Sequence, residues 1–294
     1  MKEVLLLGAT GFIGSNIAKE LSRQGRFWVG VARAPRSGNN PILTLDDEAG
    51  VMDALQERPV VINALGGLKP RDFDQNFELA MEEFWCALQR VLGLLRHQPP
   101  SALLQISSAG TVYGEARNGP SKESDPPAPR SWYGRMKVVE EAMLEQFAKS
   151  AGVTYMCARV TNPFGNEDHP THGLVDVLID HVTRGMPFCA QFDVVACRDF
   201  IYAPEMAKAL VAMIDHPRPG IFNVGRGEST QLRRLVDLAT HFSSIARIEV
   251  GAPSPSDVVK SEVAVDRFRD AFGFSPAGPS AVEYLEMKMK RVAV

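Results

Sequence analysis

The chain has 294 residues, of which 45% are hydrophobic and 23% charged, a composition typical of one large α/β domain or two unequal lobes. Lys plus Arg (32) against Asp plus Glu (35) gives a net charge of −3, and neither sign is clustered. This balance argues against a nucleic-acid scaffold or a polybasic membrane binder. The four cysteines lack the spacing of a zinc site or a disulfide framework, and no apolar stretch reaches the ~18 residues that span a bilayer. We therefore expect a cytoplasmic protein without a metal site, a nucleic-acid partner or a membrane partner.

Short apolar runs alternate with helical periodicity through the first part of the chain. Ile13, Ile17 and Leu21 recur at a spacing of four, and a longer helical rhythm runs from Phe77 to Leu95. The runs of strand length are Val4–Leu7, Trp28–Ala32, Val60–Ala64, Leu103–Ser107, Thr154–Ala158 and Phe222–Val224. This alternation predicts an α/β fold with a Rossmann-type, doubly wound parallel sheet.

The regular alternation ends near Asn162, and prolines punctuate the rest of the chain. We expect an NAD(P)-binding domain over residues 1–162, with segments near 198–225 that return to it, including 199–202 and 222–224. Residues 163–197 and 226–294 are expected to form a smaller, C-terminal substrate-binding lobe. The long helix from Phe77 also carries Trp85, Val91 and Leu94 beside its main apolar stripe, so it is either deeply buried or the face of a homodimer.

A glycine-rich turn follows the first predicted strand. Its spacing, Gly-x-x-Gly-x-x-Gly, suits a sharp turn, a close approach to a pyrophosphate and tight packing of helix on strand. The helix that begins after it offers N–H groups to phosphate. The predicted cofactor contacts in this turn are Gly8, Thr10, Gly11, Phe12, Ile13 and Gly14. A glycine-rich turn that binds no ligand is the alternative interpretation.

The end of the second predicted strand indicates which dinucleotide binds. An acidic residue there accepts the ribose hydroxyls of NAD, whereas an arginine accommodates the 2′-phosphate of NADP. The chain has Arg33 and Arg36 in this window and no acidic residue. The pattern predicts NADP, with NAD as a second choice, and the alternative is that Arg33 stacks on the adenine without selecting the cofactor.

A tyrosine and a lysine lie one helical turn apart in a segment that begins near Trp132. Tyr133 and Lys137 share a helix face, and an ammonium beside a phenol favours the phenolate. The pair is therefore a candidate general acid and base near neutral pH.

Seven motifs in order resemble those of extended short-chain dehydrogenase/reductases of the NAD(P)-dependent nucleotide-sugar epimerase/dehydratase type. They occupy 8–14, 106–114, 133–137, 159–165, 198–202, 222–225 and 272–276. The resemblance implies that Tyr133 is the catalytic acid/base, that Lys137 binds the nicotinamide ribose and lowers the pKa of Tyr133, and that Ala64 and Pro163 contact the cofactor. It also implies that Asn162 and Arg198 bind the diphosphate of a nucleotide-sugar.

One position departs from this family. The Ser or Thr that usually donates a hydrogen bond to the reacting sugar oxygen is replaced by Ala109. We assign that role to Ser108 and a sugar contact to Thr111, because the reaction centre needs a donor. Gly110 and Thr111 also replace the acidic pair of family dehydratases, which disfavours dehydration.

The expected function is an oxidoreductase that transfers a hydride at C4 of a nucleotide-sugar. A 4-keto reductase that releases its cofactor is favoured over an epimerase that retains NAD, because no acidic residue follows the second strand. An NADP-sensing binding protein and a reductase of another carbonyl compound are further alternatives, since a fold does not determine a substrate. Two other interpretations stay open: Asn76 either supports the site or caps its helix, and Arg198 either binds phosphate or forms an ion pair with Asp199.

Overall fold

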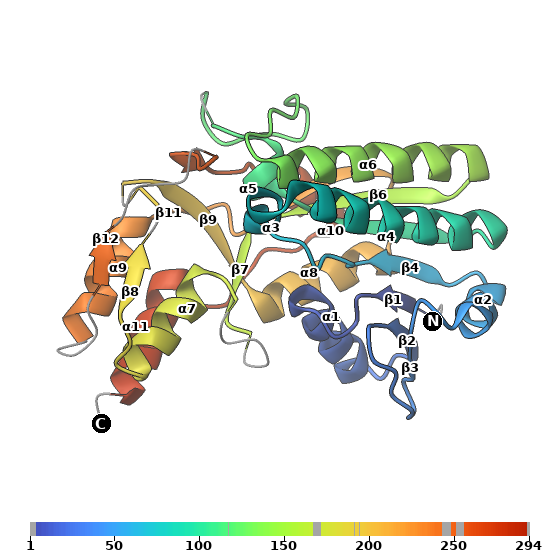
Figure 1. Ribbon diagram of the computed structural model, residues 1–294, viewed down its shortest axis with the longest axis horizontal. Coiled ribbons are helices and arrows are strands. Elements are labelled where there is room, and N and C mark those ends of the chain that lie inside the picture. Colours follow the sequence, from blue (N-terminus) through green and yellow to red (C-terminus); the bar gives the residue numbers. More distant parts are fainter. Residues whose placement is uncertain are drawn as a thin grey trace. The chain divides into compact units, whose positions relative to one another are not determined.

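The computed structural model describes residues 4–116, 118–166, 172–190, 192–193, 195–242, 248–250 and 256–292 (Figure 1). Contacts divide the chain into two compact units. The first unit contains residues 1–108, 131–159 and 207–222, and the second contains residues 109–130, 160–206 and 223–294.

A seven-stranded sheet forms the centre of the first unit, in the strand order β10-β6-β5-β4-β1-β2-β3. Its strands are β1 (Val4–Leu7), β2 (Trp28–Val31), β3 (Ile42–Leu43), β4 (Val60–Asn63), β5 (Ala102–Ser108), β6 (Thr154–Val160) and β10 (Gly220–Val224). β1 pairs in parallel with both β2 and β4. This order confirms the predicted doubly wound Rossmann-type sheet, whose strand order reverses beside its first strand.

Helices cover both faces of this sheet (Figure 1). They are α1 (Phe12–Arg23), α2 (Glu48–Gln56), α3 (Pro70–Gln75), α4 (Phe77–His97), α6 (Trp132–Ala151) and α8 (Ala203–Asp215). Leu5 and Leu7 pack in one core cluster with apolar residues of α4 and α6, such as Leu92 and Leu144. Because side chains alternate along a strand, Val4 and Leu6 point to the opposite face. Both faces of β1 are therefore apolar, as in other sheets covered by helices on both sides.

The second unit is built around a smaller sheet, in which β9 (Cys197–Tyr202) pairs with β7 (Asn162–Phe164), β11 (Ser229–Gln231) and β13 (Lys260–Ser261). β8 (Phe188–Ala190) pairs with β12 (Ile248–Val250). The helices are α5 (Ala109–Val112), α7 (Leu174–Thr183), α9 (Leu232–Phe242), α10 (Asp266–Phe272) and α11 (Ala281–Val292). Phe164, Phe200 and Tyr284 lie at the centre of its core.

The six predicted strands are all present, and residues 222–224 join the central sheet as β10. The expectation that residues 199–202 also return to that sheet is wrong. These residues belong to β9, which pairs with β7 and β11 and buries Phe200 in the core of the second unit. The sequence did not reveal β3, an edge strand of two residues. No helix in the described part of the chain has the length and apolarity needed to cross a membrane.

Candidate active site

The glycine turn lies in the first unit between β1 and α1 and is closely packed. Gly8 has a φ of +82°, and a Cβ atom there would lie 2.4 Å from the carbonyl oxygen of Ala64. A Cβ atom on Gly14 would lie 2.0 Å from the carbonyl oxygen of Gly8. Gly11 is the N-cap of α1 and brings no side chain to cover the first turn. The backbone therefore forms a cradle that a dinucleotide pyrophosphate fits.

The end of β2 lies beside this turn. The amides of Gly8 and Ala9 both donate to the carbonyl oxygen of Val31, at 2.8 and 3.1 Å. Arg33 and Arg36 follow and are exposed, and the next carboxylate in the chain is that of Asp46. Arg33 and Arg36 thus follow a strand end that is hydrogen-bonded to the glycine turn, and their role in distinguishing NADP from NAD stays a prediction.

Tyr133 and Lys137 lie in the first two turns of α6, whose N-terminus is capped by Ser131. Both residues line a cavity of about 150 Å³ whose wall is mostly apolar. Lys137 is buried, and its Nζ lies 2.5 Å from Oε2 of Glu140. Glu140 lines the same cavity.

The pKa of Tyr133 differs from the expectation. Burial of the phenol raises the pKa, Lys137 lowers it, and Glu140 raises it further, so the net shift is upward. The pKa of Lys137 is also raised: burial lowers it, but Glu140, Tyr133 and Cys157 together outweigh the effect of burial. Lys137 therefore lowers the pKa of Tyr133, as expected, but burial and Glu140 together raise it by more. The phenol therefore keeps its proton at neutral pH.

The two serines at the end of β5 have different environments. Ser107 donates to the Glu141 carboxylate, which also binds Arg159, so its role is structural. Ser108 is the last residue of β5 and is half-buried, whereas Ala109 begins α5 and is fully buried. Thr111 lies on α5 in the second unit and is half-buried. The assignment of Ser108 and Thr111 to the substrate stays a prediction.

In the second unit, Asn162, Pro163 and Arg198 line one pocket of about 310 Å³. Arg198 Nη2 lies 2.5 Å from Oδ1 of Asp257, and its Nη1 donates to the carbonyl oxygens of Cys197 and Val259. The ion pair that the sequence left open thus forms with Asp257 and not with Asp199. The guanidinium nevertheless lines the pocket, where its planar fork can bind a phosphate oxygen.

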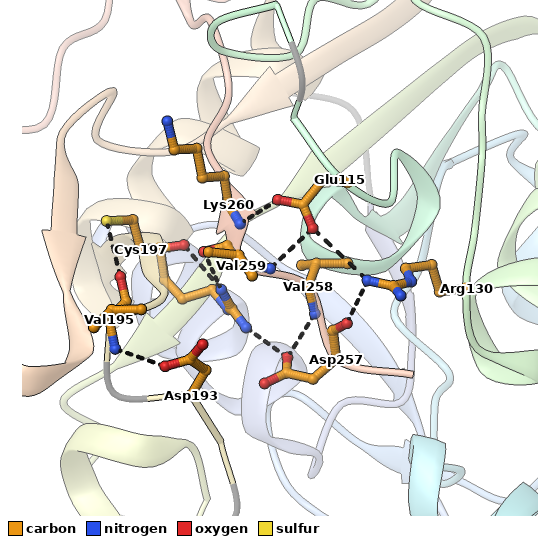
Figure 2. A network of polar contacts seen from close by, with 10 residues as sticks. Glu115, Arg130, Asp193, Val195, Cys197, Asp257, Val258, Val259 and Lys260 are labelled. Atoms are coloured by element: carbon orange, nitrogen blue, oxygen red, sulfur yellow. Dashed lines mark hydrogen bonds and ion pairs between the residues drawn. The ribbon is translucent and has the colours of Figure 1, made fainter. Parts of the chain in front are cut away.

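A polar network fixes the segment that carries Asp257 (Figure 2). The Glu115 carboxylate accepts from the amides of Val259 and Lys260, at 2.9 and 2.7 Å. Arg130 donates to the carbonyl oxygen of Asp257 at 2.8 Å. Because these bonds hold the backbone at Asp257 and just after it, the network orients the Asp257 carboxylate that binds Arg198.

Asp199 lies on β9 and is buried, and its carboxylate accepts three hydrogen bonds. They come from the amides of Arg226 and Gly227, at 3.0 and 2.7 Å, and from the hydroxyl of Thr161, at 3.3 Å. Burial nevertheless raises the pKa of Asp199 to about 7. The backbone carbonyl of the same residue accepts from Asn162, at 2.8 Å, which positions that amide.

A raised pKa in the folded state makes stability depend on pH. Between about pH 4 and pH 7 the folded chain holds a proton on Asp199 that the unfolded chain releases, so the free energy of unfolding falls as pH rises. We expect a slope of roughly −1 kcal/mol per pH unit from this group, which Asp199→Asn removes. Denaturant unfolding across this range measures the slope, with the exposed Asp270→Asn as the control. An equal slope in wild type and Asp199→Asn would contradict this reading.

Sequence reasoning missed Glu140 and Asp257. Glu140 lies three residues after Lys137 on the same predicted helix, so the sequence does contain a signal for this ion pair. No local signal indicates Asp257, because 58 intervening residues separate it from Arg198 and pairing follows only from the fold.

Asn76 caps α4 through a hydrogen bond from the amide of Leu79. No metal-binding group of His, Cys, Asp or Glu occurs in the described ranges.

A glycine turn at the first strand of a doubly wound sheet, with a half-buried tyrosine one helical turn before a buried lysine, is typical of enzymes that use a dinucleotide. The model of the NAD dependent epimerase/dehydratase family matches residues 4–225, and the chain belongs to this family. This confirms the predicted family and the prediction of an enzyme.

Relatives of this chain cover most of its length. It is 27% identical to the dTDP-6-deoxy-L-talose 4-dehydrogenase (NAD(P)(+)) of Kitasatospora kifunensis, over 93% of the chain and 90% of that protein. It is 26% identical to a putative UDP-glucose 4-epimerase of Methanocaldococcus jannaschii, over 81% of each. The crystal structure of UDP-glucose 4-epimerase from Thermotoga maritima with UDP-glucose has the same fold, with a TM-score of 0.84 and 22% identity over 98% of this chain and 97% of that one.

Proposed function

We propose that the protein is an NADPH-dependent reductase of 4-keto nucleotide-sugars. The end of β2 supports both the choice of NADPH and the direction of the reaction, because Arg33 and Arg36 occur there without a carboxylate. A cofactor that leaves after each turnover suits a reductase, whereas an epimerase retains its NAD. The relative from Kitasatospora, named for a 4-dehydrogenase that uses NAD(P)(+), supports chemistry at C4.

In this proposal the first unit binds the cofactor and the second binds the substrate. The backbone around Gly8 and Gly14 holds the pyrophosphate, and Arg33 holds the 2′-phosphate. Arg198 and Asn162 bind the diphosphate of the sugar nucleotide. The nicotinamide supplies the hydride when bound. Tyr133 then donates its hydroxyl proton to the C4 oxygen, and the Lys137 ammonium stabilises the resulting phenolate.

A measurement of cofactor binding tests the assignment of Arg33. We expect Arg33→Ala to raise the Kd for NADPH by about tenfold, the loss of a charged hydrogen bond, and to leave the Kd for NADH unchanged. Titration of nucleotide fluorescence measures both constants. The exposed Arg96→Ala at the end of α4 changes the same charge elsewhere in the first unit and serves as the control.

The second candidate is a nucleotide-sugar 4-epimerase, favoured by the name of the relative from Methanocaldococcus. It requires tightly retained NAD. A purified wild-type protein that carries NAD and binds NADPH no better than NADH would overturn the reductase and support the epimerase.

We also propose that the protein is a homodimer through α4 and α6, which lie side by side (Figure 1). These helices expose Leu79, Trp85 and Trp132, which are 50, 41 and 43% accessible. Phe77 packs on Trp132 with ring centroids 4.8 Å apart. Exposed aromatic residues of this kind are typical of protein interfaces. Light scattering on wild type and Trp85→Lys tests this assignment, which predicts a dimer for the first and dissociation for the second.

A further inference from the structure

A second carboxylate lies beside the Tyr-Lys pair. Glu140 is 7% exposed and follows Lys137 by one turn of α6. Its Oε2 accepts a hydrogen bond from Lys137 Nζ at 2.5 Å, and its Oε1 accepts one from Asn63 Nδ2 at 3.3 Å. Asn63 is itself buried at the end of β4 and also donates to Gln105, at 2.7 Å. The carboxylate is therefore held both from its own helix and from the central sheet.

The surroundings strengthen the effect of this charge. Tyr133, Lys137, Glu140 and Asn63 form the polar part of one cavity, and the rest of its wall includes Phe73, Leu88 and Met136. Charges interact more strongly in such apolar surroundings than in water. A carboxylate in contact with Lys137 offsets part of the positive charge of the ammonium. The ammonium then lowers the pKa of Tyr133 less than it would alone.

The other titratable groups near the pair come from α6 and β6 and have their own partners. Glu141 binds Arg159 and Ser107. Tyr155 donates to the carbonyl oxygen of Glu141, and Cys157 is a buried thiol whose pKa is raised by burial. Within the described ranges, Glu140 is the carboxylate that forms an ion pair with Lys137.

We propose that Glu140 is a positioning residue, which holds the Lys137 ammonium in the wall of the cavity and, together with burial, keeps the Tyr133 hydroxyl protonated as a proton donor. The inference rests on the proposed acid/base role of Tyr133 and deepens it. A reductase must deliver a proton to the C4 oxygen, whereas oxidation must begin by removing one. Glu140 thus biases the site towards reduction, and it acts through Lys137 and through its own charge.

The ionisation of Tyr133 can be measured without a substrate. Tyrosines labelled with carbon-13 at Cζ are titrated by NMR, and Tyr133→Phe assigns the resonance. We expect Glu140→Gln to lower the titration midpoint of Tyr133 by about one pH unit, because an opposing charge in contact with Lys137 is removed. Glu145→Gln removes the same charge from an exposed position on the same helix and is expected to leave the midpoint unchanged.

Two further variants separate positioning from a purely structural role. Glu140→Asp keeps the charge and is expected to retain most of the wild-type midpoint. In a Lys137→Met background, Glu140→Gln is expected to cause a smaller shift, since only the direct effect of the carboxylate remains. An unchanged midpoint in Glu140→Gln, or the same shift with and without Lys137, would overturn the inference.

The titration distinguishes this inference from the proposed function. A shifted midpoint in a protein that does not reduce 4-keto nucleotide-sugars would uphold the role of Glu140 and reject the reductase. In an active protein, Glu140→Gln is also expected to lower the pH at which kcat for reduction declines, by about the same one unit, with KM for the sugar unchanged. A changed KM with an unchanged pH profile would count against the proposed role.

Discussion

Replacement of Tyr133 by phenylalanine is expected to lower kcat by roughly 10²- to 10⁴-fold, the usual contribution of a general acid. The change removes one hydroxyl from a ring that packs against Phe73 and Met136 and leaves that packing in place. The Kd for the dinucleotide should therefore stay the same, and the loss of activity should appear in kcat. Steady-state kinetics together with a cofactor titration check both statements.

Tyr155→Phe is the matched control for this variant. It removes a buried hydroxyl from β6 in the same unit, where the hydroxyl donates to the Glu141 carbonyl oxygen at 3.2 Å. We expect it to cost about 1 kcal/mol of stability and to leave kcat unchanged. If Tyr133→Phe were as active as Tyr155→Phe, Tyr133 would not be the proton donor.

The second large effect concerns the stability of the first unit. Arg159 and Glu141 form a buried ion pair between β6 and α6, with Nε and Nη2 of the arginine 3.1 and 2.7 Å from the carboxylate oxygens. Arg159 is 2% exposed. Arg159→Met leaves the Glu141 charge buried beside Ser107 without its ion-pair partner. We expect the free energy of unfolding to fall by about 3–5 kcal/mol, as measured by denaturant unfolding.

Two controls define the cause of that loss. The double variant Arg159→Met/Glu141→Leu removes both charges and is expected to recover much of the lost stability. Arg23→Met removes an arginine whose side chain is exposed where it pairs with Glu20, and we expect it to leave the free energy of unfolding almost unchanged. A double variant no more stable than Arg159→Met would show that lost packing, rather than an unpaired charge, causes the effect.

Local patterns predicted the strand, turn and helix of the proposed cofactor site. The run Val4–Leu7, the three glycines after it and the spacing of Ile17 and Leu21 each arise from contacts within a few residues. The same holds for Tyr133 and Lys137, which share a helix face because they are four residues apart. These signals also predicted the central sheet.

Features that depend on distant parts of the chain were not predictable in this way. The strand at 199–202 has the composition of a core strand, but its partners in β7 and β11 place it in the other sheet. Asp257 reaches Arg198 only because β13 pairs with β9 and the network around Glu115 holds the preceding segment. The raised pKa of Tyr133 required knowledge of its burial, which the sequence does not contain.

The transfer of hydride from NADPH to a 4-keto nucleotide-sugar tests the proposed reductase most directly. The purified protein would be given NADPH with deuterium at the transferable position of the nicotinamide. We predict the consumption of one NADPH for each sugar reduced and the appearance of deuterium at C4 of the product. Interconversion of C4 epimers without NADPH consumption, by a protein that retains NAD and places no deuterium in the sugar, would contradict the account.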